Sequence, residues 1–145
     1  MVDRLVRLVS SRPTDAVFHA FPTAGEVADI GEAKLRTIGL TRARGATMYG
    51  VASRIADGGL DLESLRGASA DDAQAVLEEL PGIGPWTASY VRMRALGDRD
   101  AFPSADLGVI KALDAVGVAR GAIVDVAERW RPWRGYATLH LWASL

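Results

Sequence analysis

The sequence contains no cysteine among its 145 residues. Disulfides, zinc–thiolate sites and iron–sulfur clusters are therefore excluded for this chain. The sequence also lacks an excess of charge of either sign, because its 17 Lys and Arg residues are balanced by 18 Asp and Glu residues, for a formal net charge of −1. Without a bulk positive charge, any binding to nucleic acid has to come from a local basic face and from helix N-termini.

Long apolar runs and strand-like alternation are missing as well. No stretch approaches the roughly 20 apolar residues of a membrane-spanning helix. The N-terminus, residues 1–8, is the start of an amphipathic helix of mixed charge rather than a signal peptide. We therefore expect no membrane partner and a cytoplasmic location, on the nucleoid in a bacterium. With 49% hydrophobic residues the chain can bury a core, and its length predicts one compact all-α domain over residues 1–145.

Helix start signals recur along the chain. Thr23, with Glu26 three residues later, is a capping-box pattern. Thr41, Ser69 and Ser104 stand before apolar runs with helical spacing and are predicted N-caps. Together with the glycines and prolines that end such runs, these signals predict roughly nine helical pieces, including short helices over 14–21, 23–30 and 32–38, and a last helix starting at 132–133.

One stretch, LPGIGPWTA at residues 80–88, joins two of the predicted helices. Gly82 and Gly84 can adopt a positive φ and leave the backbone open to close approach. Pro85 suits a first helical position, so the turn would point free backbone N–H groups outward from a helix N-terminus. Such a turn can bind a phosphate. A helix–turn–helix corner with glycines for tight packing is the other interpretation.

Asp106 is the main candidate for chemistry. It follows Trp86 by twenty residues and stands just inside the helix that Ser104 is predicted to cap. An acidic residue there complements the helix dipole without further function. A catalytic role is the second interpretation, and the residue alone leaves both open. For Trp86, core packing and a functional role are likewise both open.

Three segments carry a family resemblance: residues 80–88, FPSADLGVIK at 102–111 and PWRGYATLHLW at 132–142. They resemble the helix-hairpin-helix DNA glycosylases, in the alkylation-repair branch of the DNA-3-methyladenine glycosylase II type. The resemblance covers roughly residues 5–145. It implies a compact multi-helix domain that releases alkylated purines, such as 3-methyladenine, from double-stranded DNA by base flipping and hydrolysis of the N-glycosidic bond.

The resemblance also assigns roles to residues. Asp106 matches the family's catalytic aspartate, which would stabilise positive charge that builds on the sugar. Trp86, Tyr90 and Trp142 match an aromatic pocket that suits a cationic base. The hairpin residues expected to bind DNA phosphate are Pro81, Gly82, Ile83, Gly84 and Thr87. Bifunctional relatives have a lysine at the position of Trp86, so no Schiff base and no strand cleavage are expected.

Cofactors and metal ligands are not expected. No cluster of metal-ligating side chains is visible, although hairpins of this kind can hold a monovalent cation through backbone carbonyls when DNA is bound. Other basic residues could face phosphate or simply solvent, and they are Arg36, Arg42, Arg44, Arg54, Arg92, Arg94 and Lys111. For His140 a hydrogen-bonded structural role is expected.

The N-terminus departs from the family pattern. Relative to the family, the chain is expected to lack the first helix of the helical region and any preceding small α/β domain. No wedge residue, which would fill the gap left by a flipped base, is recognisable. The alternative function is therefore a catalytically inactive, truncated helix-hairpin-helix module that binds DNA without sequence preference.

Overall fold

The computed structural model describes residues 2–9 and 20–145, and all regular secondary structure in this part of the chain is helical, with no strand. Its contacts group the residues into two compact units. The N-terminal unit is made of described residues up to 61 together with residues 80–82. The C-terminal unit comprises residues 62–79 and 83–145. The expected all-α class is confirmed. Most of the helix predicted over 14–21 falls outside the described residues, and Ala20 and Phe21 are not helical.

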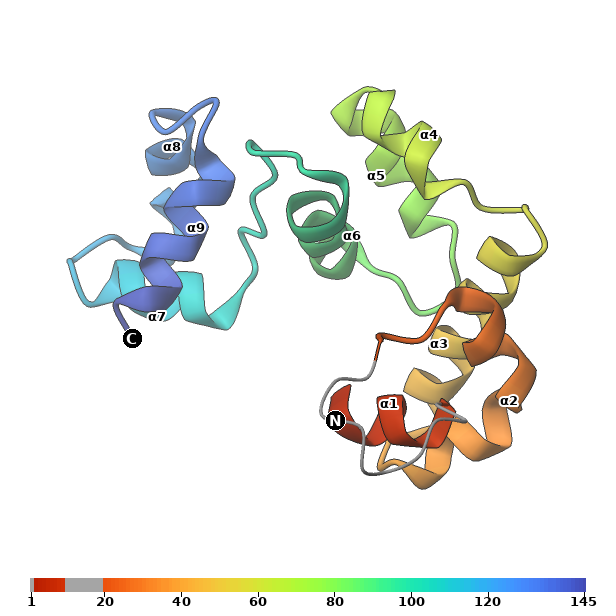
Figure 1. Cartoon of the computed structure of the whole chain (residues 1–145). Helices are drawn as coiled ribbons and strands as arrows, with labels where there is room; N and C mark the ends of the chain where they lie inside the picture. Colours follow the sequence, from red (N-terminus) through yellow and green to blue (C-terminus); the bar gives the residue numbers. More distant parts are fainter. Residues whose placement is uncertain (1, 10–19) are drawn as a thin grey trace. The chain divides into compact units, whose positions relative to one another are not determined.

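The N-terminal unit consists of α1 (Val2–Val9), α2 (Ala24–Thr37) and α3 (Arg42–Ala56), which Figure 1 shows together. The capping box is confirmed, because Thr23 Oγ1 accepts the Glu26 N–H at 3.2 Å and Glu26 Oε2 accepts the Thr23 N–H at 2.8 Å. Gly31, with φ of 75°, breaks the regular helix inside α2, where two short helices were predicted. The core of this unit contains Leu5, Val27, Leu35, Ile38, Leu40 and Ala52.

The C-terminal unit begins with α4 (Leu62–Gly67) and α5 (Ala70–Glu78). Next come α6 (Pro85–Val91) and the short π-helix η1 (Arg92–Leu96) that continues it. The remaining helices are α7 (Leu107–Asp114), the 3₁₀ turn η2 (Arg120–Ala122), α8 (Ile123–Glu128) and α9 (Arg134–Ala143). A core of Val109, Leu113 and Ile123 packs with Phe102, Trp130 and Leu141. Figure 1 shows α7 beside α9, and these two helices are in contact.

The helix ends of this unit confirm some predictions and correct others. Ser69 caps α5 by accepting the Asp72 N–H at 3.1 Å. The helix after the hairpin ends at Gly97, in the left-handed region with φ of 76°. Ser104, however, is not the cap of α7, because a further turn at residues 104–105 precedes the helix and Asp106 itself is the N-cap. The last helix starts at Arg134 rather than at 132–133.

Within residues 2–9 and 20–145, no helix is both long enough and apolar enough to cross a membrane.

Candidate functional site

Asp106 lies at the start of α7, where its carboxylate serves two purposes. Oδ1 accepts the backbone N–H of Val109 at 3.0 Å, which caps the helix. The same carboxylate receives two indole N–H groups, from Trp142 at Oδ1 and from Trp86 at Oδ2, each at 2.8 Å. Three residues separated by 20 and 36 positions along the chain are thus brought together in the C-terminal unit.

The charge state of Asp106 follows from these contacts. Burial alone would raise the pKa of the carboxyl group, but hydrogen bonds from Trp142, Val109, Trp86 and Gly108 outweigh it and hold the pKa below its ordinary value. Because both indole groups can only donate, they favour the anion over the protonated acid. The site therefore presents a fixed, ionised carboxylate at neutral pH.

The aromatic residues form a continuous arrangement beside this carboxylate. Trp86 and Tyr90 stack with ring centroids 5.6 Å apart at an interplanar angle of 20°. Tyr90 contacts Trp142 with centroids 6.0 Å apart at 37°. Trp86 remains 43% exposed and Tyr90 37% exposed. The structure thus brings the four predicted residues of the base site together, with Trp86 and Tyr90 partly exposed.

Gly108 is a residue of this site that the sequence did not identify. A Cβ at this position would lie 2.9 Å from Trp142 Cδ1, 3.2 Å from its Nε1 and 3.0 Å from Asp106 Oδ1. Any larger residue would therefore push the indole away from the carboxylate. A glycine in the first turn of a helix, where its flexibility is a disadvantage, was the signal available in the sequence.

The two glycines of the hairpin turn differ from each other. Gly82 has a φ of 85°, and a Cβ on it would lie 1.9 Å from Thr47 Oγ1, so both backbone and packing require glycine. Gly84 has an extended backbone with φ of −103°, so it does not use the positive φ that a glycine can adopt. A Cβ on Gly84 would meet no atom within 4 Å among the described residues, so its surroundings are open.

The other hairpin residues fit a turn that leads into a helix. Pro85 is the first residue of α6, as predicted, and Gly84 is its N-cap. The first backbone hydrogen bond of α6 runs from the Ala88 N–H to the Gly84 carbonyl at 2.9 Å, so the N–H groups of Trp86 and Thr87 precede it. Pro81 is exposed, whereas Ile83 and Thr87 are half-buried.

Among the basic residues singled out in the sequence, one is paired and shielded from solvent and the others are exposed. Arg92 is largely shielded and paired with Asp98, so it fits neither a phosphate contact nor a solvated charge. Arg36, Arg42, Arg44, Arg54, Arg94 and Lys111 are exposed. His140 is exposed on α9 as well, which does not fit the structural role expected of it.

Metal ligands do not gather anywhere in the described part of the chain, where no group of three or more His, Cys, Asp or Glu side chains could hold an ion.

Comparisons with known proteins agree on one group of proteins, although no family model matches the chain. The chain is 41% identical over 132 residues to a Mycobacterium tuberculosis protein described as a "probable bifunctional transcriptional activator/DNA repair enzyme AlkA", covering 90% of this chain and 26% of that protein. It is 32% identical to a DNA-3-methyladenine glycosylase of Bacillus subtilis, covering 88% and 44%. The chain thus spans about a quarter to a half of the length of the curated relatives it matches.

The fold comparison gives the same result. The solved 3-methyladenine DNA-glycosylase of Archaeoglobus fulgidus superposes with a TM-score of 0.81 at 26% identity, over 97% of this chain and 49% of that one. The similarity in sequence and in structure spans nearly the whole chain. The chain is therefore a homologue of the DNA-3-methyladenine glycosylases, with the helical fold of the helix-hairpin-helix DNA glycosylases.

Proposed function

We propose that this chain is the catalytic helical domain of a monofunctional base-excision DNA glycosylase, which hydrolyses the N-glycosidic bond of alkylated purines such as 3-methyladenine. The observation that carries the proposal is the Asp106 carboxylate, held by the indole N–H groups of Trp86 and Trp142 at 2.8 Å each. The homologues support it, since those that match the chain are described as DNA repair enzymes or DNA-3-methyladenine glycosylases.

The aromatic residues would receive the base. An alkylated purine carries a positive charge, and electron-rich rings attract a cation that stacks on them. Trp86, Tyr90 and Trp142 offer such faces next to the carboxylate. The base has to leave the double helix to reach them, so base flipping is part of the proposal. Recognition by stacking and charge favours electron-poor bases over normal ones.

Asp106 would act on the sugar. When the bond between C1′ and the base nitrogen breaks, its electron pair goes to the base and neutralises the positive charge there, and C1′ acquires oxocarbenium character. The carboxylate stabilises that charge, and a water molecule then bonds to C1′ and loses a proton to the surrounding solvent. Because the leaving base is already cationic, the step needs no strong general acid. The products are the free base and an abasic site.

The hairpin would hold the DNA strand through its backbone. The N–H groups at the N-terminus of α6 have no partner within the helix, and a Cβ on the N-cap Gly84 would meet no described atom within 4 Å. We assign Pro81, Gly82, Ile83, Gly84 and Thr87 to this phosphate contact. A tryptophan at position 86 provides no amine for a Schiff base, so cleavage of the strand is not part of the reaction.

Release of 3-methyladenine from methylated duplex DNA tests the proposal. We expect the parent chain to release the base and to leave intact abasic strands. Asp106→Asn should abolish release while DNA binding survives, because asparagine also caps a helix and keeps the fold. Binding without release in the parent chain would contradict the enzyme and favour a module that only binds DNA.

A further inference from the structure

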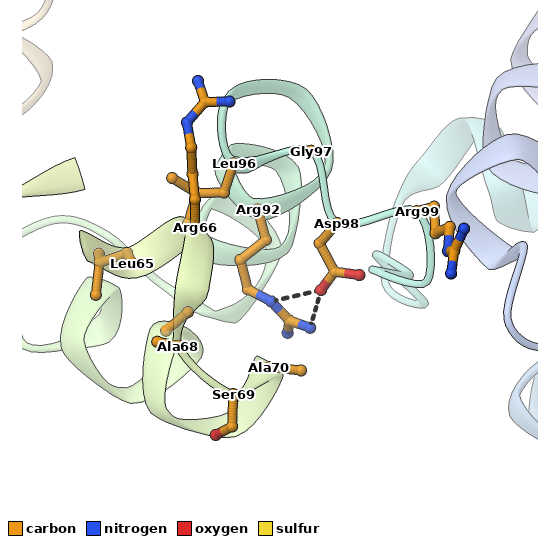
Figure 2. A pocket seen from close by; sticks show the side chains of 11 residues that line it. Leu65, Arg66, Ala68, Ser69, Ala70, Arg92, Leu96, Gly97, Asp98 and Arg99 are labelled. Atoms are coloured by element: carbon orange, nitrogen blue, oxygen red, sulfur yellow. Dashed lines mark hydrogen bonds and ion pairs between the residues drawn. The ribbon is translucent and has the colours of Figure 1, made fainter. Parts of the chain in front are cut away.

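A chain of paired side chains runs through the C-terminal unit near the Asp106 site. Gln74 on α5 donates from Nε2 to the Pro85 carbonyl at 3.2 Å and accepts the Arg92 Nη1 group at Oε1, at 2.9 Å. Arg92 also donates from Nε and Nη2 to Asp98 Oδ2, at 3.1 and 2.5 Å. Figure 2 shows this pair next to an open hollow lined by α4, the start of α5 and the end of η1. We call the Arg92–Asp98 pair the Asp98 clamp.

A second pairing begins two residues further on. Asp100 accepts Arg134 Nε at Oδ1 and Arg134 Nη2 at Oδ2, at 2.9 and 2.8 Å, which is a two-pronged contact. Glu128 Oε1 holds the remaining Nη1 of Arg134 at 3.0 Å. The two pairings are joined, since the Asp100 N–H donates to Asp98 Oδ1 at 2.9 Å. We call the Arg134–Asp100 pair the Asp100 clamp.

These pairs are shielded from solvent. The side chains of Arg92 and Asp98 are 12% and 24% exposed, and those of Arg134 and Asp100 are 15% and 21% exposed. Arg131, which also reaches Asp100, is 50% exposed. Shielded, charge-assisted bonds are stronger and more directional than surface ion pairs, so the two clamps hold geometry whereas Arg131 adds little.

The elements that the clamps join are those that carry the site. The segment from residue 98 to residue 106 ends in Asp106. Arg92 directly follows α6, the helix of Trp86 and Tyr90, and Arg134 begins α9, the helix of Trp142. The Gly135 N–H adds a hydrogen bond to the Arg99 carbonyl at 2.8 Å, and a Cβ on Gly135 would lie 2.8 Å from that oxygen. Residues 98–100 are thus tied both to Arg92, the first residue after α6, and to the start of α9.

We propose that Asp98 and Asp100, with Arg92 and Arg134, are positioning residues of the Asp106 site: the Asp98 clamp sets Trp86 against the carboxylate, and the Asp100 clamp sets Trp142. Neither clamp touches the reacting atoms. The inference rests on the proposed function only for its effect on catalysis, because the positions of the two indole groups can be measured without a reaction.

The indole N–H resonances of Trp86 and Trp142 in a ¹H–¹⁵N NMR spectrum of the full chain provide the test, assigned through Trp86→Phe and Trp142→Phe. We expect Arg92→Gln to shift the Trp86 resonance more than that of Trp142. Arg134→Gln should shift the Trp142 resonance more than that of Trp86. Arg131→Gln is the matched control, since it removes an exposed arginine from the same Asp100 and should leave both resonances in place.

A general loss of stability would move both resonances together, so the selectivity separates positioning from a merely structural role. Equal shifts of both resonances in each variant, or a folded Arg134→Gln variant with an unchanged Trp142 resonance, would overturn the proposal. Should Arg134→Gln fail to fold, Asp100→Asn removes the same clamp by a smaller change and is judged by the same resonance. Arg134→Lys should shift the Trp142 resonance as Arg134→Gln does, because an ammonium group cannot form the two-pronged contact with Asp100.

The catalytic readout follows from misplacement of the aromatic rings. In a chain that releases 3-methyladenine, we expect Arg134→Gln to lower kcat by roughly 10- to 100-fold with KM changed less than about threefold. A folded Arg134→Gln variant with a shifted Trp142 resonance and an unchanged kcat would overturn the catalytic part of the proposal. If the parent chain releases no base, the proposed function fails, while the resonances still decide whether the clamps position the site.

Discussion

Asp106 combines a structural task with the chemical task that we propose for it in one carboxylate. Oδ1 caps α7 and receives one indole group, whereas Oδ2 receives the other. All of these contacts come from donors, so they stabilise the anion and fix its orientation. A preorganised anion has little reorganisation left to undergo when positive charge develops next to it, which is what breaking an N-glycosidic bond requires.

The lowered pKa of Asp106 predicts how its contribution to stability depends on pH. Because the pKa is lower in the folded state than in the unfolded chain, the contribution is fully present above the unfolded value, about 3.9, and is lost as the pH falls through the folded pKa. Urea unfolding of the parent and of Asp106→Asn at a series of pH values measures the difference in unfolding free energy. We expect this difference to be constant from neutral pH to about pH 4 and to shrink below it. A difference that changes between pH 5 and 8 would contradict the assignment.

Gly108 provides a second prediction for a single residue. Gly108→Ala places a methyl group against Trp142 and Asp106 Oδ1, and overpacking of this kind costs roughly 1–3 kcal/mol. The matched control is Gly25→Ala, since Gly25 is also the second residue of its helix and its Cβ would meet nothing within 4 Å. We expect Gly25→Ala to be neutral or stabilising and Gly108→Ala to be destabilising, with the Trp142 indole resonance shifted. Equal effects of the two changes in urea unfolding would rule out this role of Gly108.

At the scale of elements, the hairpin turn contains one glycine that the packing requires, Gly82, and one that we propose for DNA binding, Gly84. Gly82→Ala should be destabilising for two reasons, because a left-handed φ costs an alanine about 1–2 kcal/mol and because its Cβ clashes with Thr47. Gly58→Ala is the control, since Gly58 has a φ of 80° and open surroundings, so it bears the backbone cost alone. We expect Gly82→Ala to lower the free energy of unfolding by more than Gly58→Ala does. The same loss in both variants would show that the Thr47 contact is unimportant.

Gly84 should show the opposite behaviour. Its extended backbone and open surroundings accept a side chain, and aspartate is a favoured N-cap, so Gly84→Asp should leave the melting temperature near that of the parent. The new carboxylate would lie where a phosphate is proposed to approach, and we expect binding to duplex DNA to weaken about 10-fold or more. Fluorescence anisotropy with labelled duplex DNA measures the affinity. Unchanged affinity would remove the hairpin from the proposed DNA contact.

Local patterns were sufficient to predict many of the elements. The capping box at Thr23, the caps at Thr41 and Ser69, and the turn that puts Pro85 first in α6 each depend on a few adjacent residues, and all are present. The cap at Ser104 was wrong because serine and aspartate two residues apart both satisfy the cap pattern, and a further turn at 104–105 shifts the helix start to Asp106.

Contacts between distant residues were not predictable in the same way. The family resemblance brought Asp106, Trp86 and Trp142 together, but nothing in the sequence indicated that both indole groups bind one carboxylate. The pairing of Arg92 with Asp98 and of Arg134 with Asp100 was missed for the same physical reason, since it depends on how α6 and α9 lie against residues 98–106. Gly108 was overlooked because the space it leaves is filled by a side chain 34 residues away.

At the scale of the whole molecule, similarity extends over nearly all of this chain but over only part of its relatives. The homologue from Mycobacterium tuberculosis is matched over 26% of its length and the solved Archaeoglobus fulgidus enzyme over 49%. The proposed catalytic residues all lie within the C-terminal unit, so the chemistry proposed for the chain depends on residues that the structure describes. The exposed basic side chains Arg42, Arg44 and Arg54 lie in the N-terminal unit and supply local positive charge on a chain whose formal net charge is −1.

The most direct test of the central claim is the amount of free 3-methyladenine released from methylated duplex DNA in a single turnover, with the parent chain and Asp106→Asn in parallel. We expect release by the parent, loss of release in Asp106→Asn by about a thousandfold or more, and equal DNA binding by both. Equal release by the two proteins, or none by the parent although it binds the DNA, would contradict the assignment of Asp106 as the catalytic carboxylate of this chain.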